Sequence, residues 1–251
     1  MAGHNKWSKV KRLKGALDAK RGKLFSKLAK EITLAARTGG GSPDGNPRLR
    51  SAVQAARGVS MPNDNIERAI KRGTGEGTGE AAIEELTYEG YGPCGVAMIL
   101  EAATDNKNRT AQDLRLIFSK HGGNLATSGS VAFQFKRRGL ITVPKPVASD
   151  DQVLEAALDA GADDVTVDEE HHLVLTAHDA LYAVGEGLKR KGLEPDSMKL
   201  TFVADNHVQI NDEQAAAQFL RLTDALEDND DIQNIHANAE VAEAILSKIG
   251  G

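Results

Sequence analysis

Apolar and basic positions repeat with a helical period between residues 17 and 37. One side of the helical wheel is apolar, with Leu17, Leu24, Leu28, Ile32 and Ala35. The opposite side is basic, with Lys20, Lys23, Lys27, Lys30 and Arg37. The pattern predicts an amphipathic helix whose basic side repels itself unless an anion lies along it. A phosphate backbone is the commonest such anion, and a solvated lysine face is the alternative interpretation. We call Lys20, Lys23, Lys27 and Lys30 the lysine stripe.

Two shorter helices are expected after this one. A glycine-rich loop at residues 38–45 ends the first helix, and Asn46 then has the character of an N-cap with Pro47 as the first helical residue. A third helix is expected from Pro62 to just before Gly73. Each helix has a small apolar face, so together they predict a helical domain. Residues 73–80 are a glycine-rich linker.

The rest of the chain alternates strand and helix patterns. Residues 140–203 spell the order β-α-β-β-α-β, which is typical of ferredoxin-like domains. Expected strands at 96–102, 130–135, 208–210 and 232–236, with helices at 110–120 and 212–226, give the same order a second time, split by the first. The sequence therefore predicts an α+β protein of three domains. They are a basic helical domain with its linker (1–79), a discontinuous α+β domain (80–138 and 205–251) and an α+β domain inserted into it (139–204).

Charge is distributed unevenly along the chain, although the net charge is only −5. Residues 1–79 carry 17 basic and 6 acidic side chains, whereas residues 80–251 carry 14 basic and 30 acidic ones. This asymmetry predicts a nucleic-acid arm on an acidic body; alternatively, arm and body pair with each other, within a chain or between chains. The candidate nucleic-acid-binding residues are the basic side chains of the first domain: Lys6, Lys9, Lys11, Arg12, Lys14, Lys20, Arg21, Lys23, Lys27, Lys30, Arg37, Arg48, Arg50, Arg57, Arg68, Lys71 and Arg72.

Motifs for catalysis or for a cofactor are absent. The sequence has no GxSxG, no HExxH, no paired CxxC and no dinucleotide-binding fingerprint. Residues 104–110 open a helix, where capping is a better interpretation than an anion site. His171, His172 and His178 are better read as solvated than as metal ligands. We therefore expect no catalytic residue, metal, cofactor or small-molecule substrate, and no enzyme.

Location follows from what the chain lacks. No apolar run approaches the length of a membrane span, and the first residues lack the apolar core of a signal peptide. The single cysteine, Cys94, rules out a disulfide within the chain. A cytoplasmic protein without a membrane partner is expected.

Several runs of sequence are recognisable. They are residues 1–7 (MAGHNKW), 18–23 (DAKRGK), 46–50 (NPRLR), 61–73 (MPNDNIERAIKRG), 88–93 (YEGYGP), 104–110 (TDNKNRT) and 118–124 (FSKHGGN). Together they resemble the YebC family, whose mitochondrial relatives include the translational activator of cytochrome oxidase subunit I, and the resemblance extends almost from end to end. At residues 11–14 the chain departs from the usual His-Arg-Lys form but stays basic. The resemblance implies three domains and a non-enzymatic, cytosolic role in gene expression. Bacterial members are described as probable DNA-binding transcriptional regulators, and other members act on translation at the ribosome.

The expected function is that of a nucleic-acid-binding regulator, with DNA-binding control of transcription as the leading interpretation. The runner-up is a ribosome-associated, RNA-binding translation factor whose partner is ribosomal RNA. Basic contacts to phosphate serve either function, because they position a protein without reading sequence. A third interpretation is a protein-interaction scaffold whose basic arm docks on acidic partners.

Overall fold

The computed structural model describes residues 17–76 and 81–249. It divides into two compact units, one formed by the chain up to Phe135 together with the chain from Ala204 onward, the other by Lys136–Val203. The predicted basic positions of residues 1–16 lie outside the described residues.

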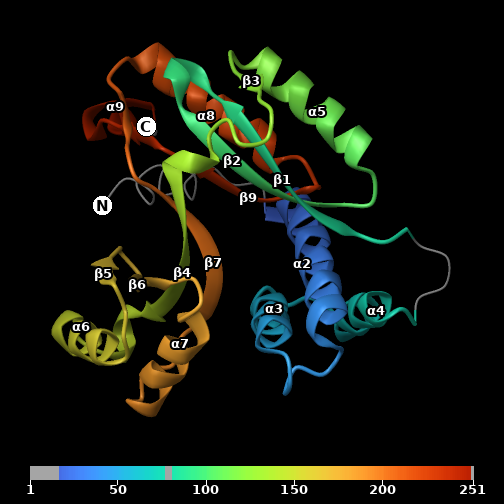
Figure 1. The fold of residues 1–251 in the computed structure, drawn as a ribbon, viewed down its shortest axis with the longest axis vertical. Helices are drawn as coiled ribbons and strands as arrows, with labels where there is room; N and C mark the ends of the chain where they lie inside the picture. Colours follow the sequence, from blue (N-terminus) through green and yellow to red (C-terminus); the bar gives the residue numbers. More distant parts are fainter. Residues whose placement is uncertain (1–16, 77–80, 250–251) are drawn as a thin grey trace. The chain divides into compact units, whose positions relative to one another are not determined.

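Among the described residues, the first unit begins with three helices, as the sequence predicts (Figure 1). They are α2 (Leu17–Gly39), α3 (Pro47–Gly58) and α4 (Asn63–Thr74). Buried apolar side chains join the three helices around α2, among them Ile32, Leu49 and Ile66. The predicted cap is confirmed, because Asn46 Oδ1 accepts a hydrogen bond from the backbone N–H of Leu49 at 3.1 Å.

Helix α4 packs against α2 at very short range. A Cβ atom placed on Gly73 would lie 2.3 Å from the carbonyl oxygen of Thr33, closer than real Cβ atoms approach a backbone atom. Only a residue without a side chain fits there, so Gly73 sets the distance between the two helices.

The same unit contains a four-stranded sheet with the order β3-β1-β2-β9. Its strands are β1 (Glu84–Tyr91), β2 (Ala97–Thr104), β3 (Asn124–Leu125) and β9 (Ile232–Ala237), all paired antiparallel. The core on one face of the sheet includes Leu100 from β2, Phe118 from α5 (Lys107–Lys120) and Phe219 from α8 (Glu213–Glu227). A short parallel pair, β8 (Val208–Ile210) with β10 (Ala239–Val241), and α9 (Glu243–Ile249) complete the unit.

The predicted second β-α-β-β-α-β order is present along the chain as β2, α5, β3, β8, α8 and β9. Strand β1, which the sequence did not predict, forms a hairpin with β2 through the 3₁₀ turn η1 (Pro93–Gly95) and lies between β2 and β3 in the sheet, while β8 pairs with β10. One strand prediction is wrong. The strand predicted at residues 130–135 is instead a loop with the 3₁₀ turn η2 (Ala132–Gln134). The reason is the buried carboxylate of Glu89 on β1, which accepts backbone N–H bonds from Gly129, Val131 and Ala132 at 2.6, 2.6 and 2.9 Å. These amides cannot also pair with a neighbouring strand.

The second unit has the predicted ferredoxin-like order. It consists of β4 (Phe135–Pro144), η3 (Lys145–Val147), α6 (Asp150–Asp159), β5 (Asp164–Val167), β6 (His171–Ala177), α7 (Leu181–Arg190) and β7 (Ser197–Ala204). The sheet order is β5-β6-β4-β7, and Ile141, Val174 and Leu188 are buried in its core. Ser149 and Gln152 form a capping box at the start of α6. The α+β class is therefore confirmed, and residues 139–204 remain our proposed inserted domain.

Candidate nucleic-acid interface

Three lysines of the stripe on α2, Lys23, Lys27 and Lys30, contact an acidic segment at the end of α8. We call residues Glu227–Asp231 the acidic segment. Lys23 Nζ lies 3.1 Å from Asp228 Oδ1 and 3.2 Å from the Asp228 carbonyl oxygen. Lys27 Nζ donates to the Glu227 carbonyl at 2.8 Å, and Lys30 Nζ donates to the Asp230 carbonyl at 2.9 Å. Of the sequence alternatives for these lysines, the structure shows pairing of the basic arm with the acidic body.

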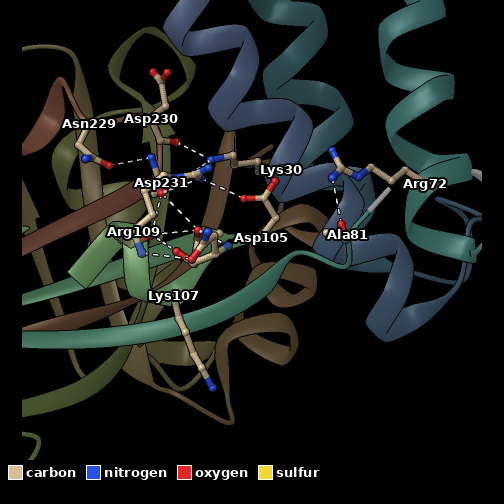
Figure 2. Close-up of polar contacts among 12 residues, drawn as sticks. Lys30, Arg72, Ala81, Asp105, Lys107, Arg109, Asn229, Asp230 and Asp231 are labelled. Carbon is tan, nitrogen blue, oxygen red and sulfur yellow. Dashed lines mark hydrogen bonds and ion pairs between the residues drawn. The ribbon is translucent and has the colours of Figure 1, made fainter. Parts of the chain in front are cut away.

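Asp231 is the centre of this contact, as Figure 2 shows. Its side chain is 7% exposed, and its Oδ1 accepts a hydrogen bond from Lys30 Nζ at 2.7 Å. Its Oδ2 accepts from Thr110 Oγ1 at 2.7 Å and lies 3.4 Å from Arg109 Nη2. Burial acts to raise the pKa of Asp231, but the hydrogen bonds from Lys30 and Thr110 and the nearby positive charges outweigh it and lower the pKa.

The segment 104–110 caps α5, as predicted. Asn106 Oδ1 accepts from the backbone N–H of Arg109 at 3.1 Å, and Arg109 also pairs with Asp105 at 3.0 Å. The charge of Asp231 is the main cause that raises the pKa of Arg109. This polar cluster therefore connects α2, α5 and the start of β9 through charges that balance one another.

Arg48 is held by two carboxylates rather than left for a ligand. Its Nε lies 2.8 Å from Glu31 Oε1, its Nη2 lies 3.0 Å from Glu31 Oε2, and Nη2 also pairs with Glu85. Burial acts to lower the pKa of Arg48, but the two carboxylates outweigh it and raise the pKa. The guanidinium thus joins α2, α3 and β1.

Three more candidate arginines stabilise backbone carbonyls of the fold. Arg37 donates to the Ile83 carbonyl, Arg50 to those of Pro43 and Asp44, and Arg72 to that of Ala81. Figure 2 shows Arg72 reaching Ala81. These side chains hold loop segments next to the helices by hydrogen bonds, and part of their donor capacity is therefore satisfied within the protein.

Three candidate side chains are exposed and unpaired within the described ranges. They belong to Arg57 near the end of α3 and to Arg68 and Lys71 on α4, and none of them makes a hydrogen bond or ion pair. Arg21 lies over the ring of Phe25, with 5.9 Å from Cζ to the ring centroid. The remaining candidates lie outside the described residues or side chains: Lys6, Lys9, Lys11, Arg12, Lys14 and Lys20.

Two histidines of the second unit contact carboxylates. His171 Nε2 lies 3.0 Å from Asp196, and His172 Nε2 lies 2.9 Å from Asp150. The expectation of a solvated side chain is wrong for His172, which is buried, whereas His178 is exposed. In the part of the chain that the structure describes, no group of three or more His, Cys, Asp or Glu side chains is arranged to hold a metal ion. No helix among the same residues is long and apolar enough to cross a membrane.

Comparison with known proteins decides the family. A profile of the TACO1/YebC protein N-terminal domain matches residues 5–76, and a profile of the TACO1/YebC second and third domain matches residues 83–239. The chain belongs to the TACO1/YebC family. The resemblance stated from the sequence motifs is thereby confirmed.

Relatives of similar length support this membership. A protein of Rubrobacter xylanophilus, named a probable transcriptional regulatory protein, is 51% identical over 251 residues and covers 100% of both chains. A protein of Sulfurihydrogenibium with the same description is 51% identical over 252 residues, again with full coverage of both. Among solved structures, a conserved hypothetical protein of Aquifex aeolicus is 48% identical with a TM-score of 0.84, covering 90% of this chain and 93% of that one. The fold described here is thus shared with this solved protein.

Proposed function

We propose that this chain is a non-enzymatic, nucleic-acid-binding regulator of gene expression, and that it acts on DNA in the cytoplasm as a transcriptional regulator of YebC type. The names of its relatives support the regulatory role, since several are called probable transcriptional regulatory proteins. The excess of basic residues in the helical domain supports an anionic partner.

The observation that carries this proposal is the set of exposed, unpaired basic side chains on α3 and α4. Carboxylates neutralise Arg48, and the acidic segment neutralises Lys23 and Lys30, whereas Arg57 and Lys71 have no such partner among the described residues. An exposed guanidinium or ammonium group without a carboxylate partner is available to a phosphate, to which it binds with release of counterions. We therefore place the first phosphate contacts at Arg57, Arg68 and Lys71. The lysine stripe and the basic residues of 1–16 extend the proposed interface along the chain.

A second candidate function, binding of ribosomal RNA in translation, has its own support. Asp64 and Glu67 are also exposed on α4, so this helix does not present a uniformly basic side to a DNA groove. Isolated phosphate contacts of this kind also suit a folded RNA, which proteins recognise largely by shape and backbone.

Crosslinking in cells, with sequencing of both the bound DNA and the bound RNA, separates the two functions. We expect enrichment of chromosomal sites and loss of that enrichment in the R57Q/R68Q/K71Q variant at equal protein abundance. Enrichment of ribosomal RNA alone would replace the first assignment by the second. Absence of both would leave the basic face without a nucleic-acid role and overturn the proposal.

A further inference from the structure

Three lysines of the lysine stripe already bind oxygens of the same chain. Lys23, Lys27 and Lys30 follow one another at about one helical turn along α2, and each reaches an oxygen of the acidic segment. We infer that the acidic segment Glu227–Asp231 acts as a built-in competitor for nucleic acid at the lysine stripe. This inference rests on the proposed function, because it concerns how the same basic surface is made available.

The oxygens that meet the lysines carry full or partial negative charge, as the oxygens of a phosphate backbone do. Two are carboxylate oxygens, of Asp228 and Asp231. The others are carbonyl oxygens at the end of α8 and in the turn that follows it, including those of Glu227 and Asp230. The last carbonyls of a helix lack partners within the helix and carry partial negative charge, so they attract cations. Lysines that bind this row of negative oxygens are therefore also suited to bind a row of phosphates.

The contact weakens from its inner end to its outer end. Lys30 and Asp231 are 20% and 7% exposed, whereas Lys23 and Asp228 are 42% and 72% exposed. Exposed ion pairs are screened by water and salt and contribute little to stability. Removing the partner of a buried charge, in contrast, costs considerable free energy. The outer pair is thus the one that nucleic acid displaces first, and Lys30 with Asp231 keeps the acidic segment anchored.

Competition of this kind has a measurable consequence in the full-length protein. Asp228→Asn removes one competing charge and should tighten binding of a duplex DNA probe several-fold. A lysine released to a duplex phosphate should also steepen the slope of log affinity against log salt by about 0.9. Asp228→Glu keeps the charge and should bind like the unchanged protein.

A double-mutant cycle separates competition from general electrostatics. We expect the gain from Asp228→Asn to vanish in a Lys23→Gln background, because the lysine that it releases is then missing. Glu155→Gln on α6 removes an equal charge from an exposed site and should leave affinity unchanged. Circular dichroism of each variant confirms the fold.

The outcomes distinguish this inference from the proposed function. Binding by the unchanged protein with no gain in Asp228→Asn, or with an equal gain in the Lys23→Gln background, would overturn the competition and leave the proposed function standing. No binding of DNA or RNA by any of these proteins would overturn both.

Discussion

Lys30 Nζ lies 2.7 Å from Asp231 Oδ1, although 201 positions of sequence separate the two residues. Both side chains are largely removed from solvent, so this pair ties the helical domain to the sheet that carries α5 and α8. The acidic segment is therefore a structural partner of α2 as well as its proposed competitor.

Asp231→Ala should lower the free energy of unfolding by about 2–4 kcal/mol, because it leaves Lys30, Thr110 and Arg109 without their shared acceptor. The lowered pKa of Asp231 means that its contribution is fully present above the ordinary aspartate pKa of about 3.9 and is lost as the pH falls through the lower, folded-state value. Urea unfolding at several pH values measures both effects. An unchanged midpoint at pH 7 would show that the pair contributes nothing.

Glu89→Gln should destabilise the loop that contains η2. The charged carboxylate accepts three backbone N–H bonds, and an amide would turn its own N–H groups toward one or more of these donors. We expect a loss of about 1.5–3 kcal/mol at pH 7. Burial acts to raise the pKa of Glu89, but the three hydrogen bonds outweigh it and lower the pKa, so the loss should shrink as acid protonates the unchanged protein. Glu84→Gln, on the exposed end of β1, is the matched control and should be nearly neutral.

Arg48→Lys should lower stability without changing nucleic-acid affinity. A lysine cannot reproduce the paired hydrogen bonds that the guanidinium makes to Glu31 while it also contacts Glu85. These groups are about one-third to one-half exposed, so we expect a loss of only about 1 kcal/mol. Thermal unfolding and a DNA-binding titration test the two parts. A large loss of affinity in a folded variant would show that Arg48 contributes to nucleic-acid binding and would contradict this prediction.

Gly73→Ala should separate α4 from α2. The added methyl group would lie 2.3 Å from the Thr33 carbonyl oxygen, and relief of this overlap requires a backbone shift that costs about 1–3 kcal/mol. Gly58→Ala is the control, because nothing lies within 4 Å of a Cβ there and the residue is helical. That change should be neutral or stabilise by up to about 1 kcal/mol.

The sequence predicted the elements whose signals are local. The helical period of residues 17–37 and the N-cap at Asn46 both appear in the structure. Nothing in the local pattern of residues 130–135 indicated that a carboxylate some 40 positions away accepts hydrogen bonds from backbone N–H groups of this loop. Strand β1 was likewise not predicted, because its burial depends on long-range pairing with β2 and β3.

The sequence predicted the group of basic residues that forms the candidate interface, but not which of them are paired within the protein and which are exposed. Composition located the basic residues in the first domain, and it left open whether they bind an external or an internal anion. The structure separates Arg48, which two carboxylates hold, from Arg57 and Lys71, which are exposed. The partner of Lys30 could not be found from sequence, since a run of acids after a helix is usually solvated. These distinctions depend on contacts between residues that are distant in the chain.

The salt dependence of binding by R57Q/R68Q/K71Q tests the central claim most directly. If each of the three side chains neutralises one phosphate of duplex DNA, the slope of log affinity against log salt should become shallower by about 2–3. K107Q/K120Q/R190Q removes the same charge from exposed positions on α5 and α7 and should leave the slope within about half a unit. An unchanged slope in the folded R57Q/R68Q/K71Q protein would contradict the placement of the phosphate contacts on α3 and α4.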